Sequence, residues 1–345
     1  MKISRACLVL LLTLGLAVML PSRCLAHPRA AEELSSTSRR PIFEFHSGFW
    51  INLHHFLYEA AALQDNGPHP ARHELIAADD SAVEATLTPE EQKTWNAAIA
   101  YYKANLICKD LLANDAMRDI KNQLEQAKDA DALSRSPHME PALISVLNRA
   151  APIYRAHWWA QHDRANHAWM DSVSPLVAEH GRALTEDLSK AFGTPWPEQP
   201  LRVDVVAYAN WAGAYTTLRP SRITVSSLDA RNQQTAALEI LFHEASHTLI
   251  ENVGDTLIRD FAAHRKTAPR DLWHALLFFT AGYYVHQICP DYVPYADRND
   301  LWQHGFSSQF EEVLVADWQP HLEGKVTLEA ALARLAADFP EHGRS

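Results

Sequence analysis

Residues 241–250 read LFHEASHTLI, in which two histidines stand four residues apart and a glutamate follows the first of them. On an α-helix this spacing puts His243 and His247 on one face, so both rings can be directed at the same cation. Glu244 is turned by about 100° from His243, where its carboxylate can act as a general base on a metal-bound water. The pattern predicts a catalytic Zn²⁺ site with Glu244 as the catalytic base. The alternative is a chance match in a chain with 19 histidines.

The residues around the motif predict a helix of about 18 residues with the motif near its centre, ended by Asn252 and Gly254. Before it stand three β-branched or partly alternating segments, which predict short strands at residues 201–210, 212–218 and 222–228. We therefore expect the motif helix to follow a small sheet directly.

A catalytic zinc takes three protein ligands and a water, so one further ligand is needed. The helix expected to begin near Pro269 carries His274 as the one polar side chain in its apolar run, residues 272–279. A buried imidazole needs a partner, and a zinc ion would supply one. His274 is our first candidate for the third ligand. Alternatively, His274 is a core histidine bonded to a carbonyl, and Glu311 or Glu312 supplies the third ligand.

Tyr295 lies in the proline-punctuated segment DYVPYADRND, residues 291–300, which is suited to rimming a cleft. A phenol near the metal could stabilise an oxyanion, so Tyr295 is our candidate for a second catalytic residue. Packing is the alternative role. Metal-bound histidines are normally oriented by a further polar group, for which the candidates are Asp297, Asp300 and Asp317.

The motif HEASH after a short strand resembles the zincin clan of metallopeptidases. Val253 stands where a metzincin would have its third histidine, so the distant third ligand is closest to the gluzincin arrangement, which usually employs a glutamate. This likeness covers only about residues 230–320. The segments FHSGFWINLHHFLYEAA and LWHALLFFTAG are similar to an uncharacterised group of secreted bacterial HExxH proteins, a likeness that would cover most of the chain but implies no substrate.

The fold class expected is α+β and predominantly helical. From residue 41 to 195 the pattern predicts helices, with Thr88, Pro89 and Glu91 forming a capping box at the clearest helix start. The helices are expected at residues 48–64, 115–128, 140–150, 152–171 and 174–191. A helical part, 41–195, is expected to pack against a zincin-like part, 196–340, with a cleft between them. His54 and His55 could line that cleft, or serve as polar residues of the core.

The N-terminus predicts a secretory signal peptide over residues 1–26, followed by a disordered stretch over 27–40. A short basic start precedes an apolar run, and Cys-Leu-Ala resembles a cleavage site. An uncleaved anchor helix and a lipoprotein signal are the alternatives. Removing residues 1–26 takes away three basic residues and no acidic one, so the net charge of −11 becomes −14. An acidic chain without a basic cluster is a poor match for nucleic acid, and no later segment predicts stable membrane insertion.

Two cysteines, Cys108 and Cys289, remain after the expected cleavage. In an oxidising compartment they predict either one disulfide between distant parts of the chain or two buried free thiols.

The sequence thus predicts a secreted or periplasmic zinc hydrolase, with a peptide or protein as the first substrate class. The alternative is a secreted binding or envelope-associated protein whose zinc is structural or catalytically silent. A third hypothesis keeps zinc hydrolysis but changes the bond, for example to an amide in a cell-wall component. Neither the substrate nor the oligomeric state follows from the residues.

Overall fold

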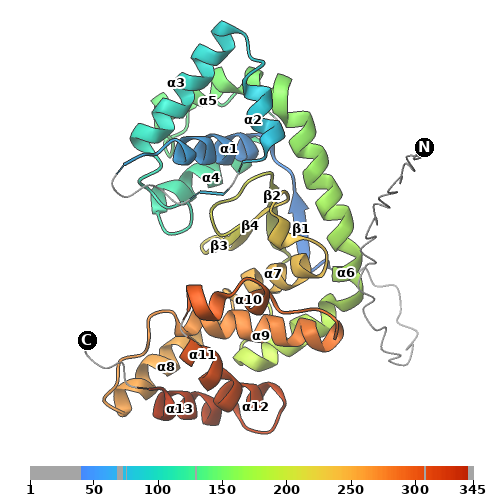
Figure 1. Ribbon diagram of the computed structural model, residues 1–345, viewed down its shortest axis with the longest axis vertical. Coiled ribbons are helices and arrows are strands. Elements are labelled where there is room, and N and C mark those ends of the chain that lie inside the picture. The colour runs from blue at the N-terminus through green and yellow to red at the C-terminus, as the bar shows by residue number, and fades with distance from the viewer. Residues whose placement is uncertain (1–39, 68–72, 75, 129, 307, 341–345) are drawn as a thin grey trace, which may run out of the picture.

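The computed structural model describes residues 40–67, 73–74, 76–128, 130–306 and 308–340. The expected signal peptide and all but the last residue of the expected disordered stretch lie outside these ranges. The chain is mostly helical with one small four-stranded sheet, so the α+β fold class is confirmed. In Figure 1 the sheet occupies the middle of the molecule, between an upper group of helices and a lower one.

The upper group is built from helices that precede residue 155. The capping box at the start of α3 is confirmed, because the Thr88 side chain accepts from the Glu91 backbone and the Glu91 side chain accepts from the Thr88 backbone. The elements are α1 (Phe49–Leu63), α2 (Ala78–Glu84), α3 (Pro89–Asn105), α4 (Asp115–Ala127) and α5 (Pro141–Tyr154).

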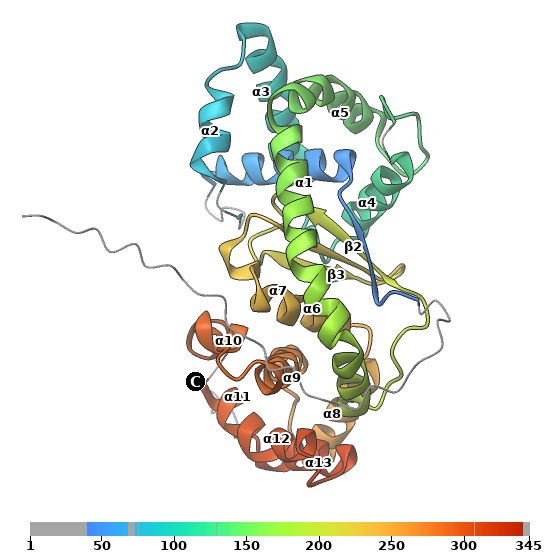
Figure 2. The same ribbon diagram turned by 90° about the vertical axis from the view of Figure 1, so that its right-hand side faces the viewer.

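One long helix, α6 (Ala160–Phe192), follows a π-helical turn at Arg155–Trp159 and runs along the side of the molecule past the sheet (Figure 2). Two helices were expected here, at 152–171 and 174–191, so the expected break is wrong. Pro175 lies inside α6, where it cannot donate a backbone hydrogen bond. The Ser174 hydroxyl donates to the Met170 carbonyl beside this position, and the helix continues because both of its halves pack on the core.

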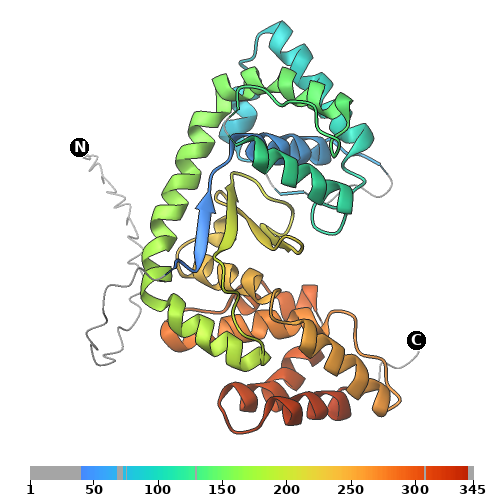
Figure 3. The same ribbon diagram turned by 180° about the vertical axis from the view of Figure 1, so that it is seen from behind.

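The sheet has the order β1-β2-β4-β3, which makes β1 and β3 its edges. β1 and β2 are parallel, β2 and β4 are parallel, and β3 is antiparallel to β4. The three expected strands are confirmed as β2 (Leu201–Val206), β3 (Ala214–Thr217) and β4 (Arg222–Ser226). β1 (Phe43–His46) was not expected, and Figure 3 shows it beside α6.

The lower group contains the expected HExxH helix and the helices packed around it. The elements are α7 (Thr235–Ser246), α8 (Glu251–Ala263), α9 (Leu272–Ile288), α10 (Tyr295–Arg298), α11 (Ser308–Val313), α12 (Gln319–Leu322) and α13 (Leu328–Asp338). Among the described residues, no helix is both long and apolar enough to cross a membrane.

Two groups of buried apolar side chains form the core, and each contains residues from both sides of the expected boundary at residue 195. The upper core takes in Tyr215 and the chain around Val206 from the sheet. The lower core takes in Phe43 from β1 and much of α6, including Trp169. The sheet therefore joins the two parts, with β1 supplied from one side of the expected boundary and β2–β4 from the other.

Strand β3 connects the two cores through side chains on its opposite faces. The Tyr215 hydroxyl lies 2.8 Å from His55 Nε2 and 2.9 Å from the buried amine of Lys121, both in the upper group. The next residue, Thr216, bonds to Glu244 in α7. This alternation is the ordinary geometry of a strand, and here it places one residue of the sheet directly beside the motif helix.

Candidate metal centre

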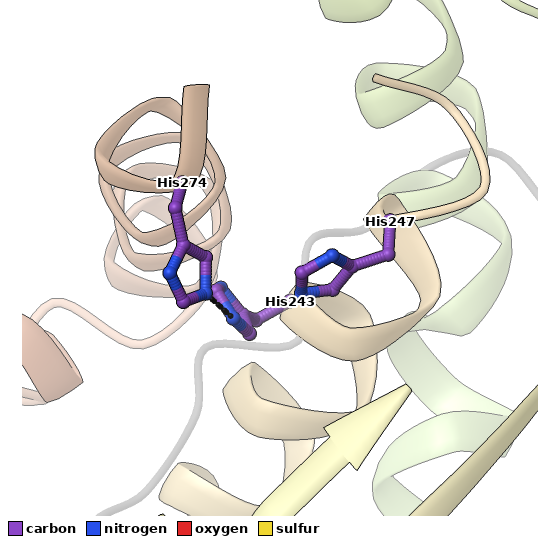
Figure 4. Close-up of side chains that lie close together, drawn as sticks. All are labelled: His243, His247 and His274. Atoms are coloured by element: carbon purple, nitrogen blue, oxygen red, sulfur yellow. Dashed lines mark hydrogen bonds between the residues drawn. The ribbon is translucent and has the colours of Figure 1, made fainter. Parts of the chain in front are cut away.

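Three histidines from two helices come together in the lower part of the molecule. His243 and His247 come from the end of α7, and His274 comes from the first turn of α9, which packs against it (Figure 4). One possible ligand nitrogen from each ring lies within 4.8 Å of the other two. His243 Nε2 and His274 Nε2 are 3.3 Å apart. The residues that the sequence singled out as ligands are therefore neighbours in space.

The three rings are held in the neutral form, which is the form that binds a metal ion. Burial, together with the neighbouring His274 and His247, lowers the pKa of His243 well below its ordinary value. Burial also lowers the pKa of His247 to about 3, with His274 acting in the same direction. For His274, burial lowers the pKa to about 4, while Asp271 acts in the opposite direction. Three neutral imidazoles pointing at one another could hold a metal ion.

The motif lies at the C-terminal end of its helix, and the expectation of a central position on a longer helix is wrong. α7 has 12 residues and ends at Ser246. His247 is the C-cap with φ −57° and ψ −24°, so it keeps helical geometry and the four-residue spacing holds. The chain then turns without glycine, because the backbone N–H groups of His247, Thr248 and Leu249 each donate to the carbonyl three residues earlier. The expected stop residues lie inside α8 instead.

Aromatic rings contact all three imidazoles. Phe278, one turn after His274 on α9, stacks on His243 with 3.8 Å between ring centroids. Trp273 stacks on His274 and meets His247 edge-on, with centroid distances of 5.1 and 5.6 Å. Phe278 was not among the expected site residues, although its place four residues after His274 puts both on one face of α9.

Glu244 is buried beside the cluster and touches the sheet. Its Oε2 lies 2.7 Å from the Thr216 hydroxyl on β3 and 3.7 Å from His247 Nε2. Burial raises the pKa of Glu244 to about 8, and the hydrogen bond from Thr216 acts in the opposite direction. Thr216 was not among the expected site residues, because nothing in its strand distinguishes it from its neighbours.

Tyr295, the second expected catalytic residue, is separated from the histidine cluster by the ring of Phe278. Its ring stacks on Phe278 with 5.8 Å between centroids, and its backbone N–H donates to the buried carboxylate of Glu239. Burial raises the pKa of Tyr295 to about 12. No ring contact or hydrogen bond between Tyr295 and the three histidines occurs in the described structure.

The alternative third ligands lie outside the histidine cluster. Glu311 lines a separate small cavity with Asp297 and Trp302, and Glu312 is exposed. Of the aspartates considered for orienting a ligand, Asp297 accepts from the Trp302 indole and not from a histidine. The carboxylate that acts on the pKa of His274 is Asp271, the residue before α9, which the sequence analysis did not consider.

The other histidine pair and the two cysteines also have clear places. His54 and His55 are fully buried in the upper core, where His54 meets the Tyr102 hydroxyl and His55 meets Tyr215. They are therefore polar residues of the core, which was the second of the two roles expected from the sequence, and they do not line a cleft. Cys108 is exposed and free, so both expectations are wrong: it forms no disulfide with Cys289, and it is not a buried thiol.

A cavity of about 550 Å³ lies directly beside the cluster. His247 forms part of the cavity wall, between the turn after β3 and the start of α8. None of the residues that line the cavity belongs to residues 41–195. The lining residues are Leu218, Arg219, Ser221, His247, Thr248, Ile250, Glu251, Gly254 and Trp273.

Comparison of the chain with models of known families, with curated proteins and with solved structures gave no match.

Proposed function

We propose that this protein is a secreted or periplasmic zinc hydrolase that cleaves peptide bonds. The observation that carries the proposal is the meeting of three neutral, inward-facing imidazoles with a buried glutamate next to one of them. A neutral histidine has one N–H donor and one acceptor nitrogen, and the 3.3 Å contact between His243 Nε2 and His274 Nε2 can serve only one pair of the three rings. A shared cation gives all three lone pairs a partner.

The donor set fits zinc in chemistry, and one pair of its nitrogen atoms has the spacing of a zinc site. Zinc binds imidazole nitrogen at about 2.0–2.1 Å, so two ligands of a tetrahedral site stand about 3.3–3.4 Å apart. His243 Nε2 and His274 Nε2 are separated by 3.3 Å. Only three possible ligands gather in the described part of the chain, and three protein ligands with one open position are typical of a catalytic site.

A zinc ion bound there would lower the pKa of a coordinated water toward about 7 and polarise a substrate carbonyl. Glu244 would take the proton from that water. A nearby dication favours the carboxylate form, which opposes the effect of burial on the pKa of Glu244. Thr216 fixes the carboxylate through Oε2, so the other carboxylate oxygen, Oε1, is left to act as the base.

The edge of the sheet favours a peptide substrate over other amides. β3 pairs with β4 on one side only, which leaves its other edge without a partner strand in the described sheet, and the face that carries Thr216 packs on α7 with the candidate site. An extended peptide can add to such an edge through backbone hydrogen bonds, which would bring one of its amides to the metal centre. A non-peptide amide could not use this edge in the same way.

The proposal is tested by elemental analysis of the purified protein, with His274→Ala and Glu244→Gln analysed in parallel. We expect one zinc per chain, loss or loosening of zinc in His274→Ala, and full zinc content without peptide hydrolysis in Glu244→Gln. A Glu244→Gln variant that still cleaves peptides would refute the mechanism. Zinc that is bound but leaves the parent inactive towards every peptide and protein tried would favour the structural or silent zinc site. A parent that binds no zinc, even after incubation with the ion, would end the proposal.

A further inference from the structure

We infer that the cavity beside His247 is the subsite that selects the substrate, and that it takes a bulky, uncharged side chain next to the bond to be cleaved. This inference rests on the proposed function and adds the specificity of the same site. It depends on where the cavity lies, which side chains form its wall, and how much room it leaves.

The position of the cavity ties it to both the metal centre and the edge strand. His247 is in its wall, and Trp273, also in the wall, contacts the rings of His247 and His274. Leu218 and Arg219 belong to the wall as well, and they follow β3 directly, since that strand ends at Thr217. A peptide paired with β3 would therefore pass the metal centre with one side chain facing this cavity.

The wall favours an apolar side chain. Leu218 is 44% exposed and Trp273 is 36% exposed, so both present apolar surface to the cavity. Ile250 adds a third apolar surface. A ligand that covers these side chains removes apolar area from water, which is the main source of affinity in such pockets.

The charges in the wall cancel and do not select a charged side chain. Arg219 and Glu251 are both exposed and lie on different elements, the turn after β3 and the start of α8. An acidic side chain would be attracted by Arg219 and repelled by Glu251, and a basic one would meet the reverse. An uncharged side chain avoids both costs.

The cavity has room for a large group, and one glycine keeps it open. Its volume of about 550 Å³ falls within the usual range for ligand pockets, about 300–1,000 Å³. Gly254 lies inside α8, where glycine weakens a helix relative to alanine. A Cβ added at Gly254 would meet no atom within 4 Å. A larger residue at this position therefore begins in open space at the wall of the cavity.

The test compares the binding of three hydroxamic acids to the zinc-loaded full chain by calorimetry. Acetohydroxamate reports on the open metal centre alone, and matched alanyl and phenylalanyl hydroxamates report on the subsite. We expect the phenylalanyl compound to bind about tenfold to a hundredfold more tightly than the alanyl compound. Gly254→Phe should remove this advantage and leave acetohydroxamate binding unchanged. Gly48→Phe is the matched control, because a Cβ at Gly48 also meets open space but lies outside the cavity.

The outcomes separate the inference from the proposed function. Binding of acetohydroxamate without a phenylalanyl advantage would overturn the subsite and leave the zinc hydrolase standing. The same holds for an advantage that survives in Gly254→Phe, or for a glutamyl or lysyl hydroxamate that binds more tightly than the phenylalanyl one. A zinc-loaded protein that binds no hydroxamate has a closed site, and this result would overturn both proposals.

Discussion

The Thr216 hydroxyl lies 2.7 Å from Glu244 Oε2 and 2.8 Å from the Glu244 carbonyl oxygen. One side chain of the edge strand thus touches both the backbone and the carboxylate of the residue between the two histidines of α7. The contact fixes the distance between β3 and the candidate base, so a peptide held on β3 would be held at a defined distance from Glu244.

Thr216→Val is expected to lower kcat by about 10- to 100-fold, because a buried hydrogen bond to a carboxylate contributes about 1.5–3 kcal/mol. Valine has nearly the shape of threonine and only the hydroxyl is lost. Thr216→Ser keeps the hydroxyl and should stay close to the parent. Zinc content should be unchanged in both variants, and KM should change little. A loss of kcat confined to Thr216→Ser, with Thr216→Val close to the parent, would assign the effect to packing of the methyl group and not to the hydroxyl.

Phe278→Leu is expected to weaken zinc binding, because the Phe278 ring lies 3.8 Å from the His243 ring and restricts its orientation. Groups that orient metal ligands change affinity by about 10- to 100-fold when they are altered. The change would be measured by competition for zinc with a chromophoric chelator. Phe279→Leu is the control, since Phe279 is next on the same helix but packs on Trp302. Equal affinities in the two variants would remove the role of Phe278.

Glu59 and Glu74 should each make the protein less stable as the pH rises from about 5 to about 8. Burial raises the pKa of Glu59 to about 8 and that of Glu74 to about 8. In this range the folded state keeps protons that the unfolded state has released, so the unfolded state binds fewer protons. Each group then lowers the free energy of unfolding by at most about 1.4 kcal/mol per pH unit.

Glu59→Gln tests this pH dependence with little change in shape. Glu59 Oε2 accepts from the Glu74 backbone, and Oε1 is buried without a partner, so the amide of glutamine can occupy that side. In urea unfolding between pH 5 and 8.5, the free energy of unfolding of Glu59→Gln should rise relative to that of the parent as the pH increases. Glu90→Gln, at an exposed position of α3, should follow the parent. Parallel curves for the parent and Glu59→Gln would contradict the raised pKa of Glu59.

The third histidine could be found from the sequence because burial constrains it strongly. A single polar residue in an apolar run must face a polar partner, and α9 packs on α7 along that run, so His274 reaches the other two histidines. Thr216 could not be found in this way. The packing of the sheet on α7 decides which strand residue meets Glu244. That packing depends on contacts between residues far apart in the chain, such as Thr216 and Glu244, which are 28 residues apart.

Two errors concern segments that are defined by backbone hydrogen bonds and not by residue type. β1 is only four residues long, and it is a strand because Phe43 pairs with Leu201 in a distant part of the chain. A segment of this length carries no periodicity of its own. Likewise Asn252 and Gly254 are ordinary stop residues, yet α7 ends before them, because its last turn is closed by backbone hydrogen bonds and α8 begins at Glu251.

Gly282→Ala is expected to destabilise the protein, whereas Gly254→Ala should stabilise it. A Cβ at Gly282, in the buried part of α9, would lie 2.9 Å from Pro294 Cβ and 3.1 Å from Glu239 Oε1. Such overpacking costs about 1–3 kcal/mol. It outweighs the gain of about 0.5–1 kcal/mol that alanine brings to a helix interior.

At Gly254 the added methyl group meets open space, so only the gain in helix stability remains and no steric cost opposes it. Urea midpoints at constant m-value would measure both changes, with zinc content as a check that the metal centre is intact. A lower midpoint for Gly254→Ala would mean that the added methyl group meets other atoms in the wall of the cavity and that the space beside residue 254 is not open. An unchanged midpoint for Gly282→Ala would mean that Pro294 yields at no cost, and the rigid packing of α9 against residue 294 and α7 would have to be abandoned.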